Sequence, residues 1–304
     1  MKLIRFLQNG EASGQLARVG LLQDGQVYDL GLENLLDGLD KASSQTYPNS
    51  DTPIYPLEKI RLLAPVSRPP SFRDFMSYEL HIENSRRKNS GTEVPSQWYE
   101  IPVFYFSNPH AFYGSDEAIP YPQGSEALDC EFEWAAIIGK DGYNVSAAQA
   151  TEHIAGFMLL NDWSARDLQR QEMAVGLGPA KGKDFATSIG PYLVTPDELA
   201  DRYDPATGLY DLESVWRING KEKSRNNTKS QYHSFARCIE RAAANTWIRR
   251  GDVIGSGTLG NGCLLEEGPE RAGWLQVGDV VELEIERLGV LRGVIGDALI
   301  GKGL

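Results

Sequence analysis

Cysteine, histidine and methionine are scarce in this chain of 304 residues, with 3, 4 and 4 copies. Cys130, Cys238 and Cys263 lie far apart and form no CxxC pair, which argues against a disulfide framework or a zinc knuckle. No apolar run is long enough to cross a bilayer. Residues 1–9 are too polar for a signal peptide, so we expect a cytoplasmic protein that does not bind membranes.

Basic residues are also few relative to acidic ones. The 30 Lys and Arg residues face 42 Asp and Glu residues, which gives a net charge of -12. Proteins that bind nucleic acid carry basic surfaces, so this composition argues against such a partner. The hydrophobic content of 41% is sufficient for a large core. A small molecule is the partner that we expect.

The length fits one large domain or two unequal ones. Residues 1–60 have the pattern of a small β-rich domain, with a hairpin turn predicted at Asp24-Gly25. Residues 45–56 are rich in Ser, Thr, Pro and Asn, which is typical of a linker. We expect residues 61–304 to form the larger domain.

Strand-like runs dominate the larger domain, and helical patterns are rare. Apolar spacing predicts a helix over residues 71–88, with Asp74 and His81 on one face. The predicted strands are 103–106, 130–138, 154–160, 253–255 and 280–285. This pattern indicates a mixed, β-rich α+β fold with a rolled or sandwiched sheet rather than βαβ winding.

Acidic residues alternate with apolar ones at the start of one predicted strand. Asp129, Glu131 and Glu133 would project from one face, because alternate strand residues share a face. Such a face is either exposed to solvent on an edge strand or holds a cation. The apolar run 135–138 favours a central strand, and therefore a metal site. Spacing alone does not say which two of the three acids bind.

Two further acids support a metal. Asp162 follows the apolar run 154–160, at a strand end where ligands gather, and Asp74 lies in the predicted helix. Carboxylate oxygens suit Mg²⁺, Ca²⁺ or Mn²⁺ rather than zinc. We interpret Arg166 and Asp167 as a surface or helix-capping pair. Lys183 lies on a glycine-containing loop, where it could stabilise a developing anion if the metal is near.

His81 is a candidate base, because it follows Asp74 at helical spacing. Glu266 could orient its imidazole, although nothing local shows that the two meet. The segment 255–260 matches GxGxxG, but no helix pattern follows it. We therefore reject a dinucleotide site and interpret the segment as a tight loop near the active site.

These runs together resemble the fumarylacetoacetate hydrolase family. The resemblance rests on residues 161–169 (NDWSARDLQ), on the acids of 129–133 and on the KxFxT pattern of 183–187, and it covers roughly residues 63–290. It implies a β-roll or mixed β-sandwich in the C-terminal domain, a small N-terminal domain and a homodimer. It also suggests a role in aromatic amino acid catabolism.

The resemblance also assigns residues. Mg²⁺ or Ca²⁺ (with Mn²⁺ as another fitting ion) would be held by Glu131, Glu133, Asp162 and the additional carboxylate Asp74, with Asp129 outside the ligand set. Further roles fall on seven residues. His81 and Glu266 would activate water, Lys183 and Thr187 lie beside the ion, and Tyr105, Gln169, Lys183 and Thr258 contact substrate.

Two positions depart from the family pattern. A family arginine corresponds to Ser90 here, although Arg86 and Arg87 are near, and a substrate-contacting tyrosine corresponds to Met173. These differences concern the substrate rather than the chemistry.

The predicted activity is hydrolysis of a carbon–carbon bond in a 1,3-diketo acid, such as fumarylacetoacetate or an acylpyruvate, with Lys183 and Gln169 stabilising the oxyanion. The nearest alternative is a lyase on the same fold, either an oxaloacetate decarboxylase or a 2-keto-3-deoxy sugar acid dehydratase. A third is a catalytically silent metal-binding protein. The combination of Asp74, His81 and Glu266 favours water as a reactant, and so the hydrolase.

Overall fold

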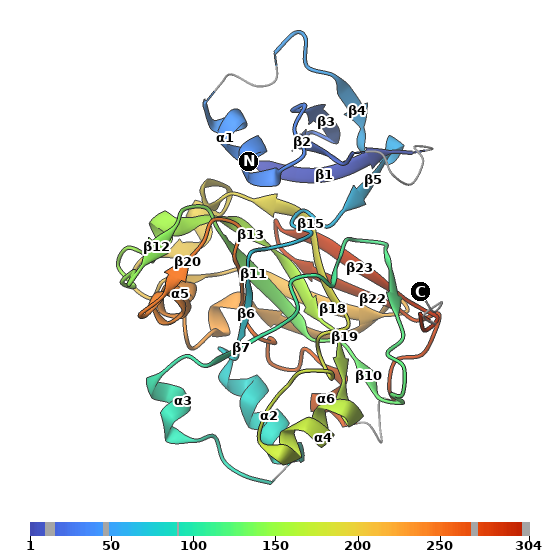
Figure 1. Cartoon of the computed structure of the whole chain (residues 1–304), viewed down its shortest axis with the longest axis vertical. Coiled ribbons are helices and arrows are strands. Elements are labelled where there is room, and N and C mark those ends of the chain that lie inside the picture. The colour runs from blue at the N-terminus through green and yellow to red at the C-terminus, as the bar shows by residue number, and fades with distance from the viewer. Residues whose placement is uncertain (10–15, 45–48, 90, 269–272, 300–304) are drawn as a thin grey trace.

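The computed structural model describes residues 1–9, 16–44, 49–89, 91–268 and 273–299. A small N-terminal part, blue in Figure 1, sits at one end of a larger body built on two sheets. Short helices gather at the opposite end of that body. Within the described ranges, no helix is both long and apolar enough to cross a membrane.

The N-terminal part is a small sheet with one helix. Its strands are β1 (Lys2–Gln8), β2 (Arg18–Gln23), β3 (Gln26–Asp29), β4 (Ile54–Pro56) and β5 (Ile60–Leu63), and its helix is α1 (Leu35–Ser44). The predicted hairpin joins β2 to β3. Asp24 and Gly25 both have positive φ, at 49° and 75°, as a two-residue turn that follows the strand twist requires.

The predicted linker and domain boundary look different in the structure. Residues 54–56 form β4, which pairs with β3, so this end of the predicted linker is a strand. Residues 45–48 lie outside the described residues. Strand β5 pairs with β1 rather than opening the larger part. Division of the chain into domains 1–60 and 61–304 stays a prediction.

One long sheet runs through both parts, because β1 pairs with β15 of the larger body. Its order is β4-β3-β2-β1-β15-β13-β11-β21-β6-β7, with β5 beside β1 and β8 beside β15. The strands of the larger body are β6 (Phe72–Phe75), β7 (Phe104–Phe106), β8 (Phe112–Tyr113), β11 (Phe132–Ile138), β13 (Ile154–Asp162), β15 (Thr187–Val194) and β21 (Val253–Gly255).

A second sheet has the order β19-β18-β22-β23-β9 and packs against the first. Its strands are β9 (Ala118–Pro120), β18 (Glu213–Ile218), β19 (Lys221–Asn227), β22 (Val280–Ile285) and β23 (Gly289–Gly296). Three short ribbons complete the strands: β10 (Leu128–Asp129) with β14 (Ser164–Ala165), β12 (Gly142–Tyr143) with β20 (Trp247–Ile248), and β16 (Tyr203–Asp204) with β17 (Leu209–Tyr210).

Helices in the larger body are short. They are α2 (Glu79–Asn89), α3 (Ser96–Glu100), α4 (Arg166–Val175), α5 (Phe235–Ala243) and α6 (Leu264–Glu267), with 3₁₀ turns η2 (Ala150–His153), η3 (Pro196–Arg202) and η4 (Thr228–Ser230). The turn η1 (Leu57–Lys59) lies between β4 and β5. Two packed sheets with few helices make a mixed, β-rich α+β sandwich, as the sequence predicts.

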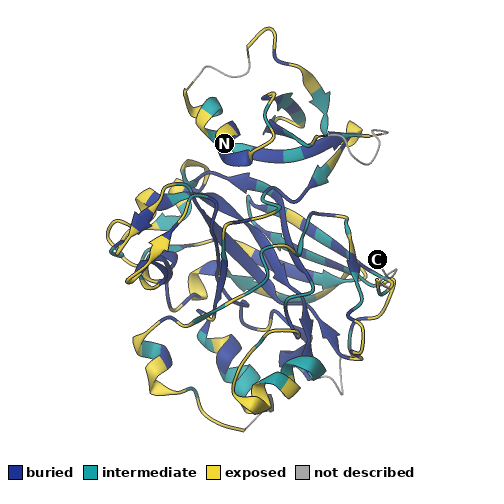
Figure 2. Cartoon of the chain, viewed as in Figure 1, coloured by how far each residue is buried: buried dark blue, intermediate teal, exposed yellow. Residues whose placement is uncertain are grey.

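The main core lies between the two sheets, and β11 is central to it. All seven residues of β11 are buried, because β13 flanks it on one side and β21 on the other. Phe132 and Trp134 face the core shared with β22, whereas Ala135 and Ile137 face a second core toward the N-terminal part. Figure 2 shows these central strands as buried and the outer loops as exposed. The predicted central position of this strand is confirmed.

The predicted helix over 71–88 is wrong in its first half. Residues 72–75 form β6, which pairs in parallel with β21 and antiparallel with β7, and the helix α2 begins only at Glu79. All four residues of β6 are buried, because the strand lies inside the sheet. These non-local pairings override the local helical spacing that placed Asp74 and His81 on one helix face.

We predict that Gly156→Ala destabilises the fold. Gly156 lies in β13, and a Cβ there would sit 2.5 Å from the carbonyl oxygen of Val194 and 2.9 Å from the Leu193 side chain. A backbone carbonyl within a sheet cannot move aside easily, so the free energy of unfolding should fall by about 1–3 kcal/mol. Urea denaturation measures this change. An unaltered unfolding midpoint would contradict the close approach of β13 and β15.

Candidate active site and metal centre

Four acidic side chains gather at one end of the long sheet. Glu131 precedes β11, Glu133 is its second residue, Asp162 ends β13, and Asp74 lies in β6. Because β11 and β13 are antiparallel, the start of one lies beside the end of the other. The Asp162 amide donates to the Glu131 carbonyl at 3.2 Å. The sheet register therefore brings acids from distant segments to one place.

The absence of a side chain at Gly255 lets Asp74 reach the other acids. Strand β21 separates β6 from β11, and its Gly255 is paired with Asp74 on one side and Ala135 on the other. A Cβ on Gly255 would collide with Asp74 Oδ1. With glycine in that place, the carboxyl of Asp74 reaches an oxygen of Glu133 to within 4.8 Å.

Three of these acids form a tight, buried cluster. Oxygens of Asp74, Glu133 and Asp162 all lie within 4.8 Å of one another, and their residues are at most 2% exposed. Burial raises the pKa of Asp74 and Glu133 far above the usual carboxylic range, and repulsion from the neighbouring carboxylates raises both further. Such a group is unstable as three anions unless a cation lies among them.

The donor set suits a divalent ion. Asp74 Oδ1 and Asp162 Oδ1 are buried and have no hydrogen-bond partner among the described residues. Free carboxylate oxygens that face each other at this spacing are typical ligands of Mg²⁺, Ca²⁺ or Mn²⁺. The residues present therefore fit the ion that the sequence predicts.

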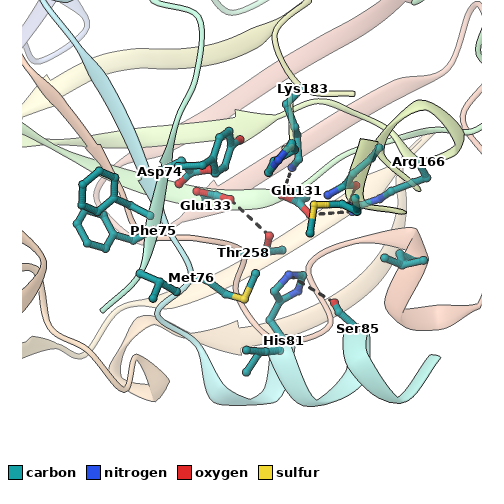
Figure 3. A pocket seen from close by; sticks show the side chains of 18 of the residues that line it. Asp74, Phe75, Met76, His81, Ser85, Glu131, Glu133, Arg166, Lys183 and Thr258 are labelled. Carbon is teal, nitrogen blue, oxygen red and sulfur yellow. Dashed lines mark hydrogen bonds and ion pairs between the residues drawn. The ribbon is translucent and has the colours of Figure 1, made fainter. Parts of the chain in front are cut away.

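Glu131 differs from the other three acids, because two cations neutralise it. Lys183 Nζ bonds to Glu131 Oε2 and also lies 2.7 Å from Asp162 Oδ2. Arg166 lies 2.8 Å from Glu131 Oε1. Burial alone would raise the pKa of Glu131, but Lys183 and Arg166 hold it well below its usual range. Glu131 thus stands beside Asp74 and Glu133, in contact with Lys183 (Figure 3), and Lys183 joins it to Asp162 of the cluster.

Fixed donors hold the cluster in place. The Tyr105 hydroxyl donates to Asp162 Oδ2, the Gly257 amide donates to Glu133 Oε2 at 3.0 Å, and Thr258 Oγ1 donates to Glu133 Oε1 at 3.4 Å. Gly257 has a φ of 78°, and a Cβ there would collide with the Phe75 carbonyl. The glycine-rich segment is therefore a tight loop against the acid cluster, as predicted.

His81 and Glu266 meet, although they are far apart in the sequence. His81, on α2, places Nδ1 3.2 Å from Oε2 of Glu266, on α6. The amides of Asn261 and Gly262 each donate to the Glu266 carboxylate at 2.9 Å, so its position is fixed. The other imidazole nitrogen, Nε2, lies 3.5 Å from Ser85 Oγ, and His81 lines the same cavity as Asp74, Glu131 and Glu133.

The interpretation of Arg166 as a surface residue is wrong. Arg166 is 3% exposed, its Nε donates to Asp129 at 2.9 Å, and its Nη1 donates to Gln169 at 3.1 Å. It also bonds to Glu131, so one guanidinium bridges two buried acids. Sequence reasoning missed this residue. The available signal was the need for a cation near Asp129, which no adjacent residue could supply.

Asp129 and Asp167 have structural positions. Asp129 is fully buried, and it accepts hydrogen bonds from the amides of Leu264 and Leu265 at 2.8 and 3.1 Å, so it anchors α6 rather than joining the acid cluster. Asp167, in the first turn of α4, accepts from Ser125 Oγ at 2.6 Å and from its own helix at the Leu168 amide. The N-cap position of α4 is Ala165, and no side chain caps the helix, so the predicted capping role is wrong.

The cavity has a volume of about 490 Å³, and charged side chains form part of its lining. Tyr105, Gln169, Lys183 and Thr258 all contribute to its lining, and so does Met173. Thr187 is not among the described residues that line the cavity. It is buried in β15, opposite Asp162 in the sheet, and Ser90 lies outside the described residues.

Two known proteins of similar sequence have different activities. The chain is 29% identical to 2,4-didehydro-3-deoxy-L-rhamnonate hydrolase of Sphingomonas sp. (strain SKA58), over 98% of this chain and 96% of that one. It is 31% identical to the mitochondrial oxaloacetate tautomerase FAHD2A of Homo sapiens, over 79% of this chain and 70% of that one. Relatives of this chain are therefore enzymes, and hydrolysis and tautomerisation both occur among them.

The fold has a close counterpart among solved structures. Fumarylacetoacetate hydrolase from the psychrophile Exiguobacterium antarcticum superimposes with a TM-score of 0.76 at 27% identity, over 98% of this chain and 99% of that one. The model of the fumarylacetoacetate (FAA) hydrolase C-terminal domain matches residues 71–295, which include every acid of the cluster. The chain belongs to the fumarylacetoacetate hydrolase family.

Proposed function

We propose that this protein is a metal-dependent hydrolase that cleaves a carbon–carbon bond in 1,3-diketo acids. The observation that carries the proposal is that members of two groups line one cavity, Asp74 and Glu133 from the first and His81 from the second. One is a cluster of three buried carboxylates that needs a cation, and the other is a histidine paired with a fixed glutamate. The first group suits a chelating substrate, and the second suits activation of water.

Asp74, Glu133 and Asp162 would hold a divalent ion, with Glu131 next to them. We propose Mg²⁺ or Ca²⁺, and Mn²⁺ also fits these ligands. Once bound, the ion would act as a Lewis acid for two oxygens of a diketo acid. Three donors, Tyr105, Gly257 and Thr258, keep the carboxylates oriented toward that position.

His81 would act as the general base. Glu266 faces Nδ1, so Nε2 is the nitrogen that can take a proton from water. Glu266 would hold the imidazole in this orientation and stabilise the imidazolium that forms. Because two backbone amides fix the carboxylate of Glu266, the pair is in place before substrate binds.

Lys183 and Gln169 would stabilise negative charge on the substrate. Burial would lower the pKa of Lys183, but Asp162 and Glu131 together raise it, so the amine carries a positive charge. That charge lies in the lining of the cavity, where it would stabilise the oxyanion that forms at the attacked carbonyl. Gln169, held by Arg166, presents its amide from the α4 side.

The shape of the cavity suits a substrate with a charged head and an apolar body. Apolar side chains of Phe75, Met76, Phe104, Met173 and Leu265 also line the cavity. The hydrolase from Sphingomonas acts, by its name, on a sugar acid oxidised at carbons 2 and 4, which is a 1,3-diketo acid. This relative matches nearly the whole chain, and it supports the same substrate class here.

A second candidate is a reaction on the same metal that does not consume water. The human relative is an oxaloacetate tautomerase, and it supports enolisation of a keto acid at such a site. The lyases predicted as alternatives, an oxaloacetate decarboxylase or a 2-keto-3-deoxy sugar acid dehydratase, belong to the same class of reaction. The His81–Glu266 pair favours the hydrolase, because a tautomerase or lyase needs no activated water.

Three further proposals come from the sequence and the family. These are a homodimer, a cytoplasmic location and a role in aromatic amino acid catabolism. They do not affect the chemistry of the cavity.

A substrate panel tests the proposed function. We expect loss of the diketone absorbance and release of two acids when the protein is incubated with acylpyruvates or fumarylacetoacetate in the presence of Mg²⁺, Mn²⁺ or Ca²⁺. Oxaloacetate and 2-keto-3-deoxy sugar acids serve as comparison substrates. Turnover of those compounds alone, with every diketone left intact, would replace the hydrolase with a tautomerase or lyase.

We predict that His81→Ala lowers kcat by about 10²–10⁴-fold, which is the usual contribution of a general base. Metal affinity should change little, because His81 is outside the acid cluster. Steady-state kinetics and calorimetric metal titration measure the two quantities. The exposed His110 provides a control, since His110→Ala should leave both unchanged. Wild-type turnover in His81→Ala would remove this residue from the mechanism.

We also predict that Glu133→Gln removes metal binding without destabilising the metal-free protein. The amide resembles a protonated Glu133, so the metal-free protein should keep its melting temperature or gain slightly as buried repulsion falls. Wild-type protein should be stabilised by about 2.7 kcal/mol at a metal concentration of 100 times Kd, and the variant should lose this gain. Glu152→Gln, at an exposed position, is the control. A full metal-induced gain in Glu133→Gln would contradict the assigned ligand set.

A further inference from the structure

A second group of potential metal ligands lies next to the acid cluster and contains different atoms. His81, Cys263 and Glu266 each offer one ligand atom, and these atoms lie within 4.8 Å of one another. All three residues are buried. Nδ1 of His81 is 3.2 Å from Glu266 Oε2, and Sγ of Cys263 is 3.4 Å from the same oxygen.

These spacings are those of a tetrahedral zinc site. Zinc binds nitrogen and carboxylate oxygen at about 2.0–2.1 Å and sulfur at about 2.3 Å, so tetrahedral geometry puts N and O roughly 3.3 Å apart and S and O roughly 3.5 Å apart. The observed separations of 3.2 and 3.4 Å are close to both. Three protein ligands with a fourth position open to water is the usual composition of an accessible zinc site.

An independent feature also points to a ligand. His81 is 5% exposed, and its Nδ1 has no well-aligned hydrogen bond among the described residues, although Glu266 Oε2 is near. A buried ring nitrogen without a good partner is the form that a metal ligand takes before the metal arrives. His81 also lines the cavity, so the proposed site borders a space that an ion can enter.

The two ligand groups select different ions. The cluster of Asp74, Glu133 and Asp162 offers only oxygen, which suits hard ions. The group at His81 adds imidazole and thiol, which suit zinc and other soft or borderline ions. We propose that His81, Cys263 and Glu266 form a separate Zn²⁺ site, and that zinc bound there inhibits the enzyme.

Inhibition follows from the proton on the imidazole. A neutral imidazole that gives its Nδ1 lone pair to zinc carries its single proton on Nε2. That nitrogen then has no lone pair, so His81 cannot accept a proton from water. The thiol of Cys263 releases its proton to solvent on binding. This inhibition rests on the proposed function, because it needs His81 to be the base, whereas zinc binding itself does not.

Cobalt is a coloured probe for this site. We expect Co²⁺ added to Mg²⁺-saturated, full-length protein to produce the near-ultraviolet absorption of a thiolate–cobalt bond. Cys263→Ser, which keeps a donor for Glu266, should abolish the band. Cys238→Ser is the matched control, because Cys238 is equally buried but lies in the hydrophobic core. Glu133→Gln should retain the band, since it alters only the carboxylate cluster.

Zinc calorimetry gives the affinity. Loss of a residue that only hydrogen-bonds to a metal ligand weakens metal binding by roughly 10–100-fold. Loss of the thiolate, a direct ligand, should weaken Zn²⁺ binding by more than this. X-ray absorption of zinc-loaded wild type needs no variant and should show one sulfur at about 2.3 Å with lighter ligands at about 2.0 Å. A first shell without sulfur, or a cobalt band that survives in Cys263→Ser, would overturn the site.

Turnover then separates the two parts of the proposal. Zinc should inhibit wild type at the concentration that saturates the cobalt-defined site, and Cys263→Ser should need at least tenfold more. If the thiolate site fills and turnover is unaffected, inhibition is refuted and His81 is not the base, while the metal site stands. If the band is absent, the zinc site is refuted and the proposed hydrolase is untouched.

Discussion

Buried negative charge is the constraint on which this structure depends. Asp74, Glu133 and Asp162 are almost completely hidden from water, and their oxygens face one another. An isolated carboxylate in such a place would be protonated, and three together would repel. Neighbouring groups partly offset this repulsion. Lys183 supplies positive charge, and hydroxyl and amide donors fix the carboxylates, yet two oxygens keep no partner among the described residues.

The fold makes this arrangement possible through strand order rather than local sequence. Antiparallel pairing of β11 and β13 puts the start of one acid-bearing segment beside the end of another. Gly255 leaves space for a third acid to reach across β21. Arg166, the first residue of α4, neutralises both Asp129 and Glu131 and so connects α4 to the site. Asp129 also accepts a hydrogen bond from the Leu264 amide, which connects α6 to the same group. The catalytic glutamate proposed on α6 is thereby placed by the same charge network as the metal ligands.

Part of this could be predicted from sequence. Alternation of acids with apolar residues, followed by the apolar run 135–138, correctly indicated a central strand and an acidic site. The two-residue turn at Asp24-Gly25 was predictable because its chemistry is local. Asp74 was misplaced on a helix, since its strand is defined only by pairing with β21 and β7. Arg166 was missed for a related reason, because its buried partners come from a distant part of the chain. The meeting of His81 with Glu266 depends on how α2 packs on α6, which no local pattern encodes.

The most direct measurement is a crystal structure of the protein soaked in Ca²⁺, with the anomalous difference map used to locate the ion. The account predicts one strong peak at roughly 2.3–2.6 Å from carboxylate oxygens of Asp74, Glu133 and Asp162. A site without any peak, or calcium bound only at surface acids, would contradict the claim that this buried cluster is built around a cation.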